Sequence, residues 1–583
     1  MKELIVDLTE KLKNAFEKSG YTGDKVRVIK SNRPDLCMYQ CNAALALAKE
    51  YKKKPIDIAN EVVDKLDRDL FTKAEAVMPG FINLDINTDY FIEYINKMYT
   101  STKYGFEESN DNQKVMIDYG GANVAKPLHV GHLRTAVIGE SIKRILRFDN
   151  QEVIGDVHLG DWGLQMGLII TEVKSMYPDL PYFNPDFNGE YPKEAPFTIT
   201  ELEKIYPRAS EKSKIDDDYK EEARQATYEL QNGNKGYYAL WEHILNVSLI
   251  DLKKNYDRLN VEFDLWKKES DAQKYIPDMV KYLKDNGYTR ISEGALVVDV
   301  KRDDDTREVP PCMILKSNGA TLYNTTDLAT LVERRELFNP TKIIYVVDKR
   351  QELYFEQVFR CAKKTKIIGE DVKLIFHGFG TMNGKDGKPF KTRDGGVMRL
   401  ENLLEEVKSK ITDKLNDNEN IDNDKKDNIA EMVTLAAIKF GDLSNQAIKD
   451  YIFDIERFTS FDGETGPYIL YTIVRIKSIL AKVDSSFDFN IMNITSKEEF
   501  ELIKKITEFS EVMRETVDEL APHKLCKYTF EVANEFNSMY HTVKILSEKD
   551  DRQRNSYLSL CKITKLILET CIDLLGFEAP DRM

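Results

Sequence analysis

The stretch KVMIDYGGANVAKPLHVGHLRTAVIGE, residues 114–140, decides the fold of this chain. It begins with a short apolar strand, passes through a loop of small residues and enters a helical pattern that continues to 148. A second apolar strand, EVIGDVHLG at 152–160, follows that helix. A strand, a crossover helix and a parallel strand make the repeating unit of a doubly wound α/β sheet. The alternation predicts a Rossmann-like, parallel-sheet domain that begins near residue 114.

Apolar strands of the same kind continue this α/β pattern toward the C-terminus, with helical patterns between some of them. We expect further strands at 294–300, 312–316, 342–348 and 373–380. The charged, helical stretch at about 171–256 has the character of an insertion into the sheet domain. The prediction is therefore one parallel-sheet domain that carries a helical insertion.

The segments on either side of this domain have different patterns of predicted helices and strands. Residues 44–66 predict two helices and residues 77–87 a strand, which together suggest a small α+β module. The low-complexity stretch at 413–428 predicts a solvated linker, and the long amphipathic patterns after it predict a helical bundle. The expected domains are an N-terminal α+β domain at 1–108, the α/β domain at 109–400 and a helical part at 401–583, with its core at about 466–583.

Composition limits the class of protein. The 583 residues are too many for one hydrophobic core, so several domains are expected. With 84 Lys and Arg against 99 Asp and Glu, the formal charge of −15 excludes a generally basic nucleic-acid coat but permits a local basic groove. Seven scattered cysteines without a CxxC pair favour free thiols in a reducing compartment. A charged start and the lack of a long apolar run predict a cytoplasmic protein without a membrane span.

The sequence HVGH places two imidazoles at the expected start of a helix. His129 and His132 are three residues apart across Gly131, so their side chains share one helix face. Unpaired N–H groups and the positive dipole at a helix N-terminus suit phosphates, and nucleotides usually bind at the carboxyl edge of a parallel sheet. The pair could also be a metal site or ordinary packing. Zinc is disfavoured because no Glu follows the first His and no Cys lies nearby.

HVGH at a strand-to-helix turn resembles the HIGH signature of class I aminoacyl-tRNA synthetases, and the wider sequence is similar to the arginyl-tRNA synthetase family. The similar segments keep the family's order over nearly the whole chain: PDLCMYQCNAALALAK (34–49), PGFINLDIN (79–87), VHLGDWGLQMG (157–167), YDRLNVEFD (256–264), LYNTTDLA (322–329), GETGPYILYTIVR (463–475), APHKLCKY (521–528) and EAPDRM (578–583). The resemblance implies a two-step reaction, in which ATP converts arginine to arginyl-adenylate and the arginyl group then passes to tRNA(Arg). It also implies that adenylate formation needs bound tRNA.

The resemblance implies that ATP binds at HVGH. His129 and His132 would stabilise the charge that develops on the triphosphate as hydrogen-bond donors, and Gly131 would accept the adenosine. Arginyl enzymes often carry a lysine just before HIGH, and Lys126 matches it on the pyrophosphate side. An exposed surface charge is the competing interpretation for any single lysine.

The second signature of the class, KMSK, is replaced in this chain. KPFKTRDGG, residues 388–396, occupies the corresponding place, so Lys391, Thr392 and Arg393 are the expected phosphate ligands, with Lys388 as the alternative to Lys391. Such phosphoryl chemistry needs in-line positioning and charge neutralisation more than a protein nucleophile. The expected catalytic residues are His129, His132, Lys126 and Lys391.

A binding site for arginine should contain carboxylates and other hydrogen-bond acceptors, because a guanidinium is planar, always charged and carries five donors. The positions that match the family's amino-acid site are Asp118, Tyr323, Asp327 and Gln351, with Asn123 and His129 for the α-amino and carboxylate groups and Glu269 as a weaker second carboxylate. Each has an alternative explanation. An Asp at a strand end is often a cap or turn former, and Tyr323 with Asp327 could be an ordinary i, i+4 helix pair.

In the family, the N-terminal module contacts the tRNA near its D-loop and the helical tail reads the anticodon. The candidate contacts are Asn42 in the first and Tyr468, Tyr471, Arg475, Tyr540 and the terminal Arg582–Met583 in the second. Tyr468 and Tyr471 could equally face the helical core.

The expected partners are L-arginine, ATP with Mg²⁺ and tRNA(Arg). No tightly bound cofactor and no dedicated metal site are expected, and the family is usually monomeric. Two alternatives stay open: a class I synthetase for another amino acid, and a synthetase-derived RNA-binding protein. The intact His129, Gly131, His132 and Lys126 argue against the second alternative.

Overall fold

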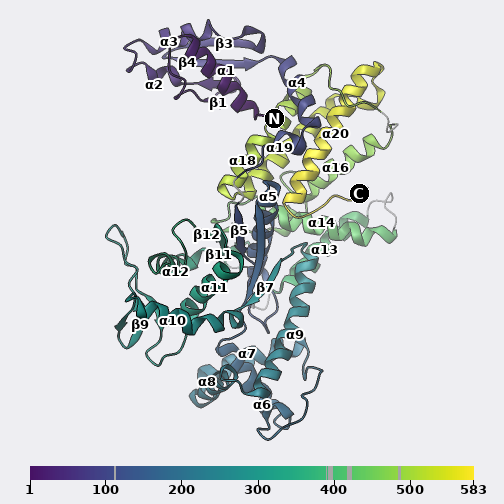
Figure 1. Ribbon diagram of the computed structural model, residues 1–583. Helices are drawn as coiled ribbons and strands as arrows, with labels where there is room; N and C mark the ends of the chain where they lie inside the picture. The colour runs from purple at the N-terminus through teal and green to yellow at the C-terminus, as the bar shows by residue number, and fades with distance from the viewer. Residues whose placement is uncertain (111–112, 389, 391–397, 417–422, 484–486) are drawn as a thin grey trace.

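The computed structural model describes residues 1–110, 113–388, 390, 398–416, 423–483 and 487–583. A parallel sheet lies at the centre of the molecule, with strands β5 (Lys114–Asp118), β6 (Glu152–Leu159), β7 (Leu265–Lys268), β11 (Lys342–Asp348) and β12 (Lys373–Phe379) (Figure 1). Their order is β12-β11-β5-β6-β7. The first strand, β5, lies in the middle and later strands add on both sides, so the strand order reverses between β5 and β11. Ligands of doubly wound sheets bind at this switch point, outside the carboxyl ends of the strands.

Helices complete the α/β domain: α5 (Val130–Phe148), α10 (Ile276–Asp285), α11 (Tyr323–Phe338) and α12 (Glu352–Lys364). The central helix α5 connects β5 to β6 and is buried along most of its length, because helices of the C-terminal part cover the side that the sheet leaves free. Its buried residues include Arg134, which donates to Asp442 (2.9 Å) and to the Gly380 carbonyl (2.7 Å). The start of α5 is therefore fixed from several directions.

Two strands assigned from the sequence to the parallel sheet do not belong to it, so that prediction was wrong. β9 (Ala295–Val298) and β10 (Cys312–Leu315) pair in an antiparallel sheet with β8 (Arg290–Ser292). Parallel neighbours are usually joined by a crossover helix, and the connection at 299–311 between β9 and β10 contains no helix. The prediction also missed β7, whose sequence LWKK carries too little apolar pattern to be recognised.

The expected helical insertion is present between β6 and β7, as α6 (Leu164–Met176), α7 (Ile199–Ile215), α8 (Asp217–Gln231) and α9 (Lys235–Arg258). The described residues of the linker expected at 413–428 are helical instead. α13 (Leu400–Asn416) and α14 (Asn423–Leu443) extend into it from both sides. They pack against each other, and Lys408 of α13 pairs with Asp427 (2.8 Å) and Glu431 (3.2 Å) of α14, so one polar residue of the expected linker, Asp427, takes part in a contact between two helices.

The C-terminal part is the expected helical bundle and the N-terminal part a small α+β unit. The bundle contains α16 (Gly466–Leu480), α17 (Lys497–Thr507), α18 (Phe509–Glu519), α19 (Pro522–Thr542) and α20 (Asp551–Leu574), preceded by the short α15 (Ile455–Phe458) and the strand pair β13 (Met382–Asn383) and β14 (Tyr451–Ile452).

The N-terminal unit has an antiparallel sheet in the order β1-β2-β4-β3, formed by β1 (Val28–Lys30), β2 (Tyr39–Cys41), β3 (Phe71–Val77) and β4 (Phe81–Ile86), with helices α1 (Leu4–Lys18), α2 (Ala43–Leu47), α3 (Pro55–Val63) and α4 (Thr88–Thr100).

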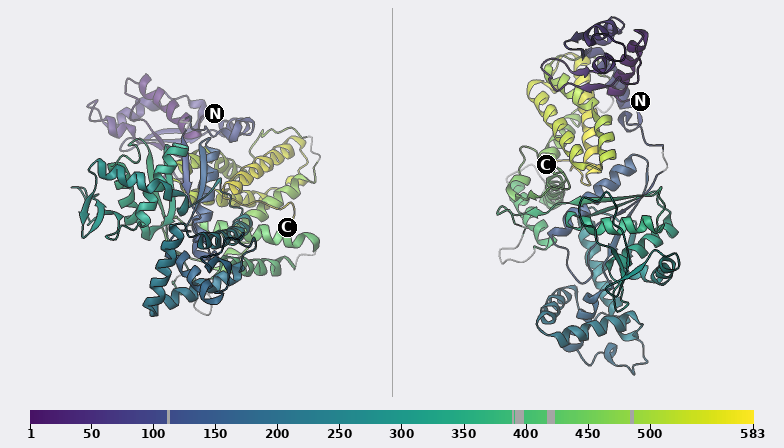
Figure 2. Two further views of the ribbon diagram at one scale, coloured as in Figure 1. Left: turned by 60° about the horizontal axis from the view of Figure 1, so that its bottom comes forward. Right: turned by 90° about the vertical axis from the view of Figure 1, so that its left-hand side faces the viewer.

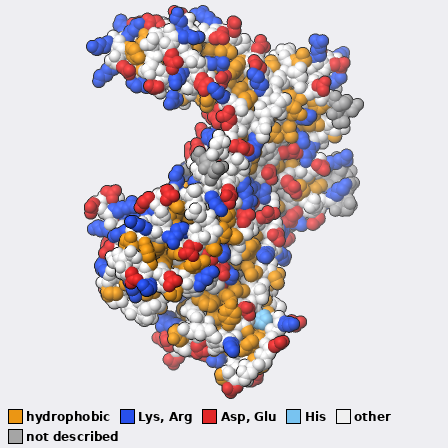
Figure 3. All heavy atoms as spheres, viewed as in Figure 1, with side chains coloured by type: hydrophobic (Ala, Val, Ile, Leu, Met, Phe, Trp, Pro, Cys, Tyr) orange, Lys and Arg blue, Asp and Glu red, His pale blue; other side chains and the backbone are white. Residues whose placement is uncertain are grey.

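The N-terminal unit docks on the helical bundle through α4. Tyr99 stacks on Phe489 with ring centroids 3.5 Å apart, and Phe91 meets Phe500 edge-on at 5.4 Å. Figures 1 and 2 place this unit and the helical insertion at opposite ends of an elongated molecule. The space-filling view shows a hollow on one side, between the N-terminal unit and the α/β domain (Figure 3). Among the described residues, none of the helices has the length and apolar character to span a membrane.

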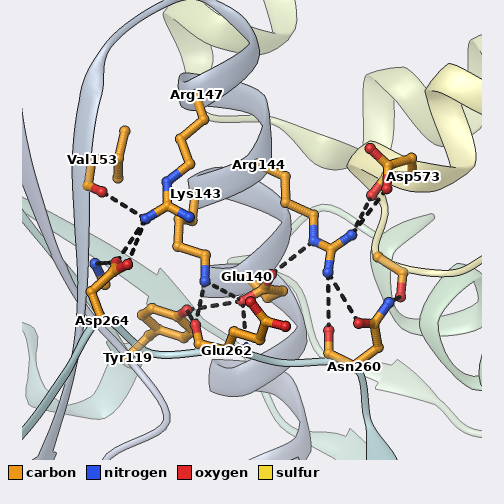
Figure 4. A network of polar contacts seen from close by, with 12 residues as sticks. Tyr119, Glu140, Lys143, Arg144, Arg147, Val153, Asn260, Glu262, Asp264 and Asp573 are labelled. Carbon is orange, nitrogen blue, oxygen red and sulfur yellow. Dashed lines mark hydrogen bonds and ion pairs between the residues drawn. The ribbon is translucent and has the colours of Figure 1, made fainter. Parts of the chain in front are cut away.

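A buried polar network ties the middle of α5 to the chain around it (Figure 4). Glu140 pairs with Lys143 (2.8 Å) and Arg144 (2.8 Å) and accepts a hydrogen bond from Tyr119 (3.0 Å). Arg144 continues to Asp573 (3.2 Å) at the end of α20. Burial alone would raise the pKa of Glu140, but the two cations reverse this effect and lower it. Glu140 is therefore an ionised centre that joins the sheet domain to the bundle.

Replacing Glu140 by alanine should lower the free energy of unfolding of the α/β domain by roughly 3–5 kcal/mol, because it leaves the buried Lys143 ammonium without its anion. Thermal unfolding followed by circular dichroism measures the change. Glu93→Ala is the matched control, since Glu93 forms an exposed pair with Lys97 and exposed pairs contribute little. Equal effects of both variants would show that the network does not stabilise the domain.

Candidate active site

A cavity of about 690 Å³ opens at the carboxyl ends of β5 and β11, at the switch point of the sheet. Its walls include the whole set of residues predicted for arginine, together with the HVGH residues: Asp118, Asn123, His129, Gly131, His132, Glu269, Tyr323, Asp327 and Gln351. These residues come from segments more than 200 positions apart in the chain. The fold thus brings the predicted acids and the predicted imidazoles to one cavity.

The two histidines at the start of α5 are oriented by backbone hydrogen bonds. His129 is the N-cap, and its Nδ1 accepts from the Gly131 N–H (3.0 Å). The Nδ1 of His132 accepts from the His129 N–H (3.1 Å), and the ring centroids are 3.9 Å apart. Because Nδ1 is the acceptor in both neutral rings, the proton lies on Nε2. Each ring therefore offers an Nε2–H donor.

The environment keeps both imidazoles uncharged. Burial lowers the pKa of His132 to about 3, with smaller contributions from His129 and Lys126. Burial and Lys126 also lower the pKa of His129. At neutral pH the pair consequently donates hydrogen bonds without carrying a positive charge.

Gly131 is required by the histidine geometry itself. A Cβ at this position would lie 2.7 Å from Cε1 of His129, closer than side-chain atoms approach. The small residue therefore lets the His129 ring fold back over the first turn of α5. Access for a nucleotide, the reason inferred from the sequence, stays a prediction.

The opposite wall of the cavity is acidic. Asp327 lies in the first turns of α11 and accepts a hydrogen bond from the Tyr354 hydroxyl, while Glu269 follows directly after β7. Burial raises the pKa of Asp327. Burial, then Asp161 and then Asp327, raise the pKa of Glu269 to about 7. In the part of the chain that the structure describes, no Lys or Arg forms an ion pair with either carboxylate, so a cationic ligand would be favoured here.

Asp118 differs from these two acids because a protein guanidinium already binds it. Arg334 of α11 is buried and donates to Asp118 (2.6 Å) and to Asp156 of β6 (2.7 Å). Its guanidinium also lies over the Tyr345 ring, 5.3 Å from the centroid. The Asp118 carboxylate therefore lines the cavity and at the same time forms an ion pair with a buried arginine. This partner could not be recognised from the sequence, since Arg334 is one of several charged residues in the helical pattern ATLVERREL.

Other cavity residues were not identified from the sequence. His158 lines the cavity at the end of β6, and both of its ring nitrogens are buried without a hydrogen-bond partner among the described residues. Tyr345, Asp348, Arg350, Tyr354 and Phe379 also belong to the lining. The rule that ligands bind at strand carboxyl ends could have found His158 and Asp348, because each lies at or near the end of a predicted strand, whereas Tyr345 lies in the middle of one. Tyr354 and Arg350 carry no such signal.

The basic residues predicted for the phosphates are only partly described. Lys391, Thr392 and Arg393 lie outside the described residues. Lys388 is exposed, and its backbone N–H donates to Asp386 (3.1 Å). Lys126 is not part of the cavity lining, and its Nζ lies 4.4 Å from the centroid of the Tyr206 ring in α7.

The candidate tRNA contacts fall into two groups. Tyr471 and Tyr540 are exposed by 42% and 38%, and the Arg475 guanidinium lies 4.8 Å from each ring centroid. Tyr468 is half-buried, and its hydroxyl accepts from Asn537 (2.9 Å), which favours the packing alternative. Asn42 is the exposed N-cap of α2, and Met583 packs partly buried against the core.

Comparisons with known proteins agree along the whole chain. Residues 2–86 match the model for the arginyl tRNA synthetase N-terminal domain, residues 95–455 the class I tRNA synthetase (R) catalytic domain, and residues 469–583 the DALR anticodon-binding domain. Proteins named arginine–tRNA ligase from Agathobacter rectalis and Alkaliphilus oremlandii are 56% and 54% identical, over 100% of both chains in each case. The crystal structure of arginyl-tRNA synthetase from Plasmodium falciparum is 26% identical with a TM-score of 0.81, over 100% of both chains. The Thermus thermophilus arginyl-tRNA synthetase has the same fold at 22% identity, with a TM-score of 0.79 over 100% of both chains.

Proposed function

The chain belongs to the arginyl-tRNA synthetase family of class I aminoacyl-tRNA synthetases, and from that premise we propose how its residues divide the reaction. The enzyme activates L-arginine with ATP to give arginyl-adenylate and pyrophosphate, and transfers the arginyl group to the 3′ end of tRNA(Arg). The observation that carries the proposal is the single cavity in which an acidic wall faces two neutral imidazoles. One wall suits a guanidinium and the other suits phosphates.

The arginine side chain would bind against Asp327 and Glu269, with Tyr323 at the exposed rim and Gln351 as a further acceptor. A guanidinium offers several donors in one plane, so carboxylates with raised pKa values gain most from it. Asn123 and His129 would hold the α-amino and carboxylate groups. The α-amino group would also contact Asp118. The ion pair of Asp118 with Arg334 already neutralises part of the charge of that carboxylate.

In the activation step, a carboxylate oxygen of arginine attacks the α-phosphorus of ATP and the bond to pyrophosphate breaks. The Nε2–H groups of His129 and His132 would donate to phosphate oxygens as negative charge develops on them. Gly131 would lie beside the adenosine. Lys126 would neutralise the leaving pyrophosphate together with Lys391, Thr392 and Arg393.

We propose that Mg²⁺ arrives with the ATP phosphates rather than on protein ligands. The described groups proposed to contact the phosphates are imidazole N–H donors and the Lys126 ammonium, which are not ligands for a hard cation. No step of the proposed mechanism is therefore assigned to a protein-bound metal.

Recognition of tRNA would use the N-terminal unit and the C-terminal bundle, which dock on each other. The stack of Arg475 between the exposed Tyr471 and Tyr540 would offer flat, cationic surfaces to unstacked anticodon bases, with Tyr468 and Met583 as further candidates. Asn42 would face the D-loop side. The proposed division is a D-loop domain at 1–108, the catalytic domain at 109–400 and the connector with the anticodon domain at 401–583. We further propose a monomer that works in the cytoplasm, where seven buried, unpaired cysteines stay reduced.

The pH dependence of arginine binding tests this assignment. A bound guanidinium favours ionised Glu269, whose pKa is raised to about 7 in the free enzyme, so protonation at lower pH should compete with arginine. The KM for arginine should therefore rise about 10-fold from pH 8 to pH 6. ATP–pyrophosphate exchange at constant ionic strength, with saturating ATP and tRNA(Arg), measures it.

Glu269→Gln supplies the control for this experiment. The variant should bind arginine more weakly at pH 8 but show a much flatter dependence of KM on pH, because its amide cannot titrate. An equally steep rise in both proteins would remove Glu269 from the arginine site. A flat profile in the unchanged enzyme would do the same.

A further inference from the structure

The insertion helix α7 contacts two basic side chains that flank the HVGH segment. Glu203 and Tyr206 are three residues apart, so they lie on one face of α7. Tyr206 places its ring under Lys126, with 4.4 Å from Nζ to the ring centroid. Glu203 forms an ion pair with Arg399. One face of α7 therefore holds a cation from each of two distant segments.

Both cations belong to segments that are bonded directly to the imidazole site. Lys126 precedes His129 by three residues. Arg399 forms an antiparallel bridge with His129, and the adjacent backbone bonds join Val130 N–H to the Met398 carbonyl (3.0 Å) and Leu400 N–H to the Leu128 carbonyl (2.9 Å). A displacement of α7 would consequently act on both sides of the HVGH turn.

The Glu203–Arg399 contact fixes α7 in place. The Glu203 side chain is only 8% exposed, whereas Arg399 is 45% exposed. A nearly buried carboxylate that lost its cation would be costly, so this pair resists movement of α7 away from the site. Tyr206 is thereby held at a constant distance from the HVGH turn.

The Tyr206 ring restricts where the Lys126 ammonium can go. A free lysine side chain samples many rotamers, and ordering it costs up to about 2 kcal/mol. A cation over an aromatic face keeps its charge and is attracted by the ring quadrupole. Lys126 lies close enough to both imidazoles to act on them electrostatically. Its ammonium is thus held near the predicted triphosphate position before ATP binds.

We propose that Tyr206 is a positioning residue for arginine activation, which seats Lys126 beside the triphosphate, and that Glu203 keeps α7 in register through Arg399. The helical insertion is then part of the activation site as well as an addition to the sheet. This inference rests on the proposed role of Lys126 at the pyrophosphate.

Removing the ring while keeping the side chain apolar tests the proposal. Tyr206→Leu should raise the KM for ATP about 5- to 10-fold in pyrophosphate exchange with the full chain and saturating arginine and tRNA(Arg). The KM for arginine should not change. Tyr206→Phe keeps the aromatic face and should behave like the unchanged enzyme. If the leucine variant does not fold, Tyr206→Met, whose longer and more flexible side chain has a similar volume, carries the same expectation.

A double-mutant cycle with Lys126→Met separates this inference from the function on which it rests. In the Lys126→Met background, Tyr206→Leu should produce no additional rise in the KM for ATP. A Lys126→Met enzyme with an unchanged KM and kcat would refute the role of Lys126 itself. If Lys126→Met weakens ATP use but Tyr206→Leu does not, or if Tyr206→Phe is as impaired as Tyr206→Leu, the positioning role of Tyr206 is wrong.

Discussion

Replacing His132 by alanine should slow arginine activation by about 10²- to 10³-fold, the usual cost of removing one preorganised donor from a site where charge develops. The structural reason is specific to this ring. Its Nδ1 is occupied by the His129 N–H, and burial lowers the pKa of His132 to about 3, so a neutral Nε2–H is its only donor. Single-turnover formation of arginyl-adenylate, at saturating ATP and tRNA(Arg), measures the step directly.

Two controls make the result interpretable. Thermal unfolding shows whether loss of the His132–His129 hydrogen bond destabilises α5, and arginine binding by calorimetry should be nearly unchanged because the acidic wall is intact. The pH profile of the unchanged enzyme should also show no ionisation of His132 above about pH 5. Arginylation by His132→Ala at the rate of the unchanged enzyme would show that the His132 donor does not contribute to arginine activation.

Replacing Asp327 by asparagine should raise the KM for arginine about 100-fold and leave the KM for ATP within about 2-fold. Asp327 is buried, accepts from Tyr354 and has no protein cation as an ion-pair partner among the described residues, so its charge is available to the substrate. Asparagine retains the shape and one acceptor oxygen but loses the charge. Steady-state pyrophosphate exchange with each substrate varied in turn gives both constants.

The matched control is Asp278→Asn, an acid in the first turn of α10 that is exposed and away from the cavity. It should leave both constants unchanged. Parallel changes in the two KM values for Asp327→Asn would mean that the substitution disturbs the whole cavity instead of the guanidinium contact. Charging of a mixed tRNA pool with each amino acid then distinguishes loss of affinity from altered specificity.

The sequence predicted the parts of the fold that local pattern controls. The strand–helix–strand unit around α5 and the amphipathic helices of the bundle carry periodicities that the structure reproduces. The partition of strands between sheets depends on connections and long-range pairing, which a local pattern does not contain, so β9 and β10 were placed wrongly. The prediction of a linker was wrong at the polar helix ends 413–416 and 423–428 for a related reason. These helix ends are stabilised by the packing of α13 against α14, which a local pattern does not contain.

The candidate site shows the same division. Asp118, Asp327 and the histidines could be located by motif and by the carboxyl-edge rule, and they do line one cavity. The motif and the carboxyl-edge rule could not predict which of these residues pair with a protein cation. Asp118 is paired with Arg334, whereas Asp327 is not, and that difference arises from the packing of α11 against the sheet. The contact of Tyr206 with Lys126 depends likewise on how the insertion folds back.

The docking of α4 on the bundle has a consequence for how the chain reaches its final form. Asn96 donates to the carbonyl of Ile491, a contact that spans 395 residues, and Phe91 and Tyr99 meet partners at similar separations. A ribosome adding about 5–20 residues per second needs roughly 20–80 s between making the two sides of this contact. Throughout that delay an apolar face of the first domain has no partner to cover it. Nascent chains halted before residue 489 should therefore engage holding chaperones, and a chain shortened at its C-terminus should aggregate through its opposite end.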